Sequence, residues 1–96
     1  PMTIEAFEAS LAGLEPPADL SAYLNALWYD AAGDWDKAHT IVQDIETEQA
    51  SAIHAYLHRK EGDESNARYW YGRASRSFPE GKTLGEEWKT LVSEFL

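Results

Sequence analysis

Apolar residues recur every three or four positions along nearly the whole chain, which is the spacing of one face of an α-helix. Ile4, Phe7, Leu11 and Leu14 form the first such stripe, and Trp88 and Leu91 belong to the last. No segment alternates between apolar and polar residues as a half-buried strand would. The pattern therefore predicts an all-α protein of about six helices. With their caps, these helices are expected in the segments 3–13, 19–32, 34–46, 47–61, 63–78 and 83–95.

The expected helix boundaries carry residue types that start and stop helices. Gly33 and Gly62 are placed to end the second and fourth helices. Thr83 and Glu86 have the spacing of a capping box at the start of the last helix. With short joints and no linker, the chain is expected to be a single domain over residues 1–96. Side-chain caps are expected at the starts of the other five helices, at Thr3, Asp19, Asp34, Thr47 and Asp63.

The second and third predicted helices are repeated by the fourth and fifth. Gly33 and Gly62 stand 29 residues apart, and an Asp follows each of them. Each unit is thus a helix, a Gly-Asp turn and a second helix, over about 19–46 and 47–78. Small alanines at matching positions would let the two helices of a unit approach closely. The further identities at this offset are Ala26 with Ala55 and Ala38 with Ala67.

These residues resemble the tetratricopeptide repeat (TPR) family. In the second unit the match rests on Gly62, Ala67, Tyr71, Ala74 and Pro79, which fall at the family's spacing. The resemblance implies two stacked helical hairpins, flanked by an N-terminal helix and by a capping helix at about 83–95. It also implies a concave surface made by the first helix of each hairpin. The segment 54–63 further resembles a group of short uncharacterised bacterial proteins, which brings no activity with it.

The TPR resemblance implies that a partner binds on the concave surface. Of the residues placed there, Tyr56, Arg59 and Lys60 are expected to be exposed for recognition. The partner segment should be partly acidic where it meets Arg59 and Lys60, and apolar where it meets Tyr23 and Leu27. The family's groove positions correspond here to Tyr23, Leu27, Asp30, Tyr56, Arg59 and Lys60.

Charge and composition narrow the partners further. The chain has 17 acidic and 8 basic residues, for a net charge of −9, and its first half holds all of the excess. Binding to nucleic acid depends on Lys and Arg that neutralise phosphates, so neither nucleic acid nor an anionic membrane is an expected partner. The chain has no Cys, which excludes disulfides and thiolate metal ligands. Pro1 before Met2 looks like a cloning remnant, no signal peptide is visible, and a cytoplasmic protein is expected.

The histidines are the main candidates for chemistry. His54 and His58 are four residues apart on one helix, a spacing found in helical metal sites. Ala55 stands where the zinc peptidases have their catalytic Glu, and a third ligand would have to come from His39 or Glu61. His54 also shares an apolar stripe, which favours a hydrogen-bonded core histidine. The sequence therefore predicts no metal and no cofactor.

No phosphate-binding glycine loop and no serine nucleophile elbow is present. We therefore expect a non-enzymatic module that binds a protein or peptide. The alternative is a self-associating structural protein, a homodimer on the same surface. An enzyme that uses the histidines to bind a metal or ligand is the least favoured interpretation.

Overall fold

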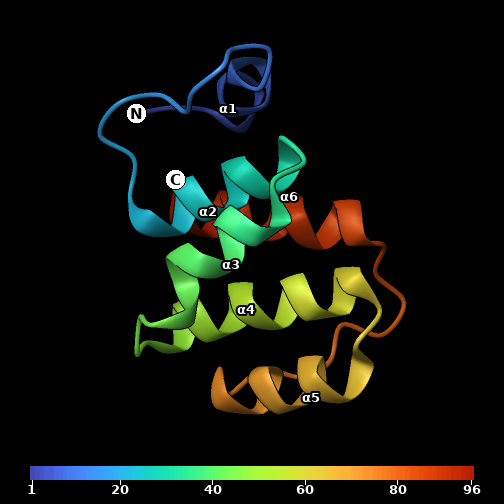
Figure 1. Cartoon of the computed structure of the whole chain (residues 1–96). Helices are drawn as coiled ribbons and strands as arrows, with labels where there is room; N and C mark the ends of the chain where they lie inside the picture. Colours follow the sequence, from blue (N-terminus) through green and yellow to red (C-terminus); the bar gives the residue numbers. More distant parts are fainter.

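The structure is a computed structural model that describes residues 1–96, and it confirms the predicted all-α class. Six helices and no strands are present (Figure 1). The molecule measures 34 × 28 × 23 Å along its principal axes. The helices are α1 (Ile4–Ser10), α2 (Ala22–Ala31), α3 (Trp35–Gln43), α4 (Glu48–Glu61), α5 (Glu64–Arg73) and α6 (Leu84–Phe95).

Most of the predicted caps form, and one does not. The side chains of Thr3, Asp34, Thr47 and Asp63 each accept a hydrogen bond from the backbone three residues on. The prediction that Asp19 caps the second helix is wrong. Ser21 does so, by accepting from the backbone N–H of Leu24 at 3.2 Å. Asp19 instead has φ +66° in the turn that precedes the helix. The capping box of α6, between Thr83 and Glu86, is confirmed.

The first helix is shorter than predicted. It ends at Ser10, whose hydroxyl donates to the carbonyl of Phe7 at 2.6 Å and accepts from the indole N–H of Trp28 at 3.0 Å. Leu14, predicted to extend the apolar stripe, lies in the following loop and is 98% exposed. Local side-chain bonds of this kind compete with helix continuation, and the indole contact also ties the end of α1 to α2.

The internal repeat is visible as two equivalent hairpins, α2–α3 and α4–α5 (Figure 1). Gly33 and Gly62 have nearly the same left-handed conformation, with φ +93° and +91°. The aspartate that follows each glycine caps the next helix. Ala38 and Ala67, at matching places on the second helices, are both fully buried. The 29-residue offset therefore marks a structural repeat.

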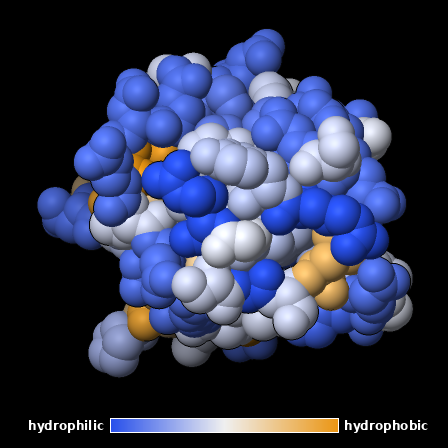
Figure 2. All heavy atoms as spheres, turned by 90° about the horizontal axis from the view of Figure 1, so that it is seen from below, coloured by the Kyte–Doolittle hydropathy of each residue, from blue (hydrophilic) through white to orange (hydrophobic).

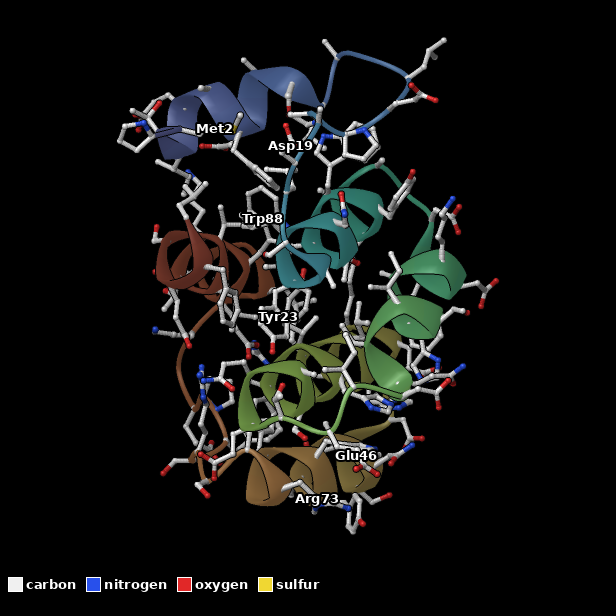
Figure 3. The ribbon with its side chains drawn as sticks, turned by 90° about the vertical axis from the view of Figure 1, so that its left-hand side faces the viewer. Met2, Asp19, Tyr23, Glu46, Arg73 and Trp88 are labelled. Carbon is white, nitrogen blue, oxygen red and sulfur yellow. The ribbon has the colours of Figure 1, made fainter.

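The last helix covers the first helices of both hairpins. α6 packs against α2 and α4, while α1 packs on the other side of α6. The indole N–H of Trp88 donates to the carbonyl of Leu27 at 2.9 Å, and the Trp88 ring lies 5.9 Å from that of Phe7. Figure 3 shows Trp88 between α6 and α1. The face that the TPR resemblance implies to be concave and open is therefore covered by α6.

One main core joins α1, α2, α3, α4 and α6, and a smaller cluster lies between α4 and α5. The smaller cluster contains Ala55, Ala67 and Tyr71. None of the six helices combines the length and the apolar character that a membrane crossing requires. The largest fully buried side chains of the main core are Trp28, Phe7, Leu27, Ile53, Leu57, Val42 and Val92.

Candidate functional site

The residues predicted to line an open groove lie beneath or beside α6. Leu27 is fully buried, and Asp30 and Tyr56 are each 2% exposed. The expectation that Tyr56 is exposed for recognition is therefore wrong. The physical reason is that α6 contributes its apolar stripe to this face, so that the first helices of the hairpins become part of the core.

Arg59 takes part in an internal network. Its guanidinium donates to Oε1 of Glu87 at 2.8 Å and to the carbonyl of Lys82. Glu87 is buried, and its other oxygen accepts from the hydroxyl of Tyr71 at 2.6 Å. Burial, and then the bond to Glu87, raise the pKa of Tyr71. The expectation that Arg59 stands free in a groove is wrong, because its side chain links α4 to α6 and is 17% exposed.

Tyr23, another predicted contact residue, packs against other helices of the protein. Its hydroxyl lies 2.9 Å from Oγ1 of Thr47, the residue that caps α4. Its ring lies 4.9 Å from that of Phe95, near the end of α6. In Figure 3 Tyr23 lies where α2, α4 and α6 meet. This side chain ties three helices together at one end of the molecule.

The remaining predicted residues, Asp30, Tyr56 and Lys60, meet in a pocket of about 330 Å³, which we call the Lys60 pocket. The buried carboxylate of Asp30 accepts from the hydroxyl of Tyr56 and from Nζ of Lys60, both at 2.9 Å. The Lys60 side chain remains 38% exposed at the rim. The pocket lies between α1, α2, α4 and α6, and is lined by Glu8, Asp30, Ala31, Tyr56, Lys60, Leu84, Gly85, Trp88 and Lys89.

The Lys60 pocket has an apolar wall and a charged rim. Trp88 and Leu84 supply the apolar surface, and the Trp88 indole N–H is already bonded to the backbone of α2. The charged groups at the rim are the ammonium groups of Lys60 and Lys89. The Lys89 ammonium lies 4.0 Å from the carboxylate of Glu8. Burial, and then the nearby Asp30 carboxylate, raise the pKa of the Tyr56 hydroxyl, so it stays protonated. The arrangement suits the binding of an apolar group flanked by negative charge.

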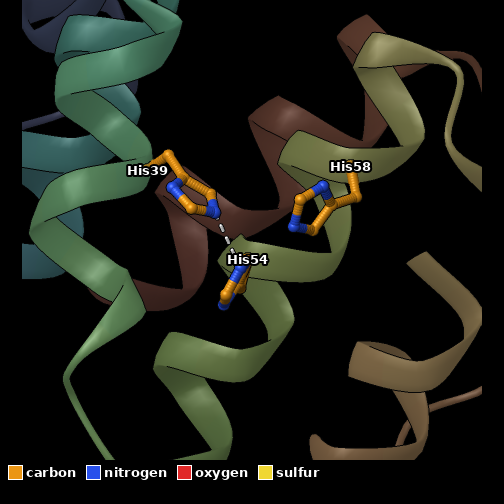
Figure 4. Close-up of side chains that lie close together, drawn as sticks. All are labelled: His39, His54 and His58. Carbon is orange, nitrogen blue, oxygen red and sulfur yellow. Dashed lines mark hydrogen bonds between the residues drawn. The ribbon is translucent and has the colours of Figure 1, made fainter. Parts of the chain in front are cut away.

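A second cluster brings together all three histidines of the chain. His39 extends from α3, and His54 and His58 extend from α4 (Figure 4). One ring nitrogen from each lies within 4.8 Å of the others, and Nε2 of His39 is 2.9 Å from Nε2 of His54. The rings of Trp35 and Trp70 stack on His39 and His54, at 4.9 and 4.0 Å. We call this group the histidine cluster.

Burial and mutual proximity determine the charge of these rings. Burial, followed by the nearby His39 and His58, lowers the pKa of His54 to about 4. Burial and then His58 also lower the pKa of His39. His54 is therefore a neutral imidazole near pH 7, with one nitrogen able to accept a hydrogen bond or bind a cation.

No protein-family model, curated protein or solved structure matches this chain.

Several pocket residues were not among those predicted. Leu84, Gly85, Trp88 and Lys89 all come from α6, which the sequence-based interpretation treated only as a capping helix. A signal was present in the apolar stripe of α6, which has to be buried against some partner. His39, by contrast, was named as a candidate third ligand, and the structure brings it next to His54.

Proposed function

We propose that this chain is a non-enzymatic, TPR-like interaction module that binds a segment of a partner protein at the Lys60 pocket, in the cytoplasm. The observation that carries the proposal is the pocket itself. Three residues predicted to contact a partner, Asp30, Tyr56 and Lys60, meet there beside an apolar wall. Concave sites with an apolar lining and a few convergent polar groups are the usual form of a binding site.

The pocket chemistry favours one kind of occupant. A volume of about 330 Å³ suits one large apolar side chain and its neighbours. Asp30 already accepts two hydrogen bonds, and the ammonium of Lys60 balances its negative charge. Lys60 uses one of its three N–H groups on Asp30 and retains the others for an incoming acceptor. We therefore propose a partner segment with an apolar or aromatic residue next to Asp or Glu.

The hydrogen bonding within the protein supports a binding role over a catalytic one. Every buried side-chain nitrogen and oxygen has a hydrogen-bond partner. In the Lys60 pocket the carboxylate and the phenol bond to each other, and the pKa of Tyr56 is raised. General acid–base catalysis needs a group whose pKa lies near the working pH. The pKa of an ordinary tyrosine is already well above neutral pH, and the raised pKa of Tyr56 is further from it, so Tyr56 is a poor general acid or base.

The exposed surface favours a different protein as the partner over a second copy of the chain. The large exposed apolar side chains belong to three separate segments: Leu14 to the loop after α1, Tyr69 to α5, and Leu96 to the residue after α6. Figure 2 shows one face covered mostly by hydrophilic residues, with small and separate hydrophobic spots. Obligate homodimers bury large apolar interfaces, and scattered single side chains do not supply one.

The sharpest test uses two helical glycines. Gly85 lines the pocket, and a Cβ added there would have only Oγ1 of Thr83 nearby, at 4.0 Å, so we choose Gly85→Leu to occupy pocket volume. Gly72, on α5 and outside the pocket, has nothing within 4 Å and provides the matched control Gly72→Leu. Leu favours helix over Gly by somewhat under about 1 kcal/mol, so both variants should fold.

Peptides selected from a random library on the immobilised domain supply the probe. We expect Gly85→Leu to weaken their binding about tenfold or more, equivalent to about 1.4 kcal/mol, and Gly72→Leu to leave it unchanged. Lys89→Glu should also weaken binding, while Lys37→Glu, an exposed charge reversal on α3, should not. Peptides that bind all four variants as tightly as the wild type would show that the pocket is not the site.

A further inference from the structure

We propose that the histidine cluster binds one divalent transition-metal ion, with Zn²⁺ the first choice, through His39, His54 and His58. This goes beyond the proposed interaction function and does not depend on it. It also opposes the sequence-based expectation that no metal binds. Three histidine ligands with a fourth position left for water are a known arrangement for zinc, and imidazole also suits copper and nickel.

The geometry is close to that of a metal site. At zinc–nitrogen distances of about 2.0–2.1 Å, tetrahedral ligand nitrogens lie roughly 3.4 Å apart. The three nitrogens here lie within 4.8 Å of one another, and one pair is 2.9 Å apart. Rotations of the side chains that move the nitrogens by about 1 Å would bring them to zinc geometry. His54 and His58 are one helical turn apart, and α3 holds His39 opposite them (Figure 4).

A carboxylate orients one of the ligands. Oε2 of Glu61 lies 2.5 Å from Nδ1 of His58, which places the proton of His58 on that side of the ring. Nε2 then carries the lone pair and faces the cluster, with the amide nitrogen of Asn66 at 3.4 Å as its present neighbour. A carboxylate bonded to the far nitrogen of a metal-bound histidine is the usual support in such sites. Glu61 is thus a positioning residue, one helical turn after the ligand that it orients.

The other two rings face each other, and one of them is within reach of solvent. Nε2 of His54 lies 2.9 Å from Nε2 of His39, so both nitrogens can contact the same ion. His39 is partly exposed, so an ion and a water molecule have a route to the cluster. The stacked rings of Trp35 and Trp70 lie on His39 and His54 and will report on a bound paramagnetic ion.

The test is a titration of protein that carries no histidine tag. We expect one equivalent of Zn²⁺ to bind in calorimetry with a Kd of about 1 µM or tighter. Co²⁺ should give the intense visible bands of a tetrahedral site, and Cu²⁺ should quench the tryptophan fluorescence at one equivalent. Since His39 is partly exposed, His39→Ala should stay folded by circular dichroism and lose the tetrahedral Co²⁺ spectrum.

A second, independent test is the effect of Glu61, which orients the His58 ring, on Zn²⁺ affinity. Glu61→Gln should weaken Zn²⁺ binding by about 10- to 100-fold, as for other carboxylates that support a metal-bound histidine. Glu46→Gln makes the same chemical change at an exposed residue outside the cluster and should have no effect. Absence of stoichiometric binding, or equal binding by wild type and His39→Ala, would overturn the proposal.

Discussion

At the scale of single residues, the structure differs most from the sequence-based expectation at Arg59. This side chain was expected to be exposed and to contact a partner. It instead donates to Glu87, a buried carboxylate that also accepts from Tyr71. A buried carboxylate without a partner is costly, because its lost hydration is not replaced. Arg59 and Tyr71 together satisfy it, which links α4 and α5 to α6.

Charge reversal at Arg59 should therefore destabilise the fold. We expect Arg59→Glu to lower the free energy of unfolding by about 3–5 kcal/mol, because it leaves the Glu87 carboxylate buried next to a second negative charge. Arg73→Glu, an exposed change on α5 with no acidic partner, should cost far less. Urea unfolding of the two variants provides the comparison. Equal stability would show that the Arg59–Glu87 pair does not form.

At the scale of elements, the close crossing within each hairpin depends on small residues. Ala67 on α5 is fully buried and belongs to the cluster that joins α4 to α5. Ala38 is equally buried in the first hairpin. A larger side chain at either position would have to push two helices apart, because protein interiors have few voids to absorb it.

We therefore expect Ala67→Leu to destabilise the protein by about 1–3 kcal/mol, the usual cost of overpacking a core. Ala9→Leu adds the same atoms at an exposed position on α1 and serves as the control. The melting temperatures of both variants, followed by circular dichroism, measure the difference. A melting temperature for Ala67→Leu equal to that of the wild type would contradict the close crossing.

Elements were also the scale at which the sequence was most informative. Helix stops and caps depend on residues within one turn of the chain. The helix ends at Gly33 and Gly62 and the capping box at Thr83 were therefore predicted correctly. The failure at Asp19 has a local cause, because Ser21, two residues later, is also a good cap. The early end of α1 depends on Trp28, a contact from another helix that no local signal contains.

At the scale of the whole molecule, the main unpredicted feature is the position of α6. Its stripe showed that one face is buried but could not show which helices cover it. The groove residues were carried over from a resemblance that implied an open surface. With α6 in place, Leu27 and Tyr56 join the core, while Lys60 remains at the rim of a pocket. Long-range packing of this kind depends on the joint between α5 and α6, whose path the pattern did not specify.

The seating of α6 on α2 and α4 decides both what is buried and where a partner can bind. Nuclear Overhauser spectroscopy of the wild-type protein tests it most directly. We predict cross-peaks between the ring protons of Tyr23 and Phe95, whose centroids are 4.9 Å apart, and between the indole N–H proton of Trp88, which donates to the carbonyl of Leu27 at 2.9 Å, and the protons around Leu27 on α2. A folded α6 that shows neither cross-peak would contradict it, and the concave face would then be open.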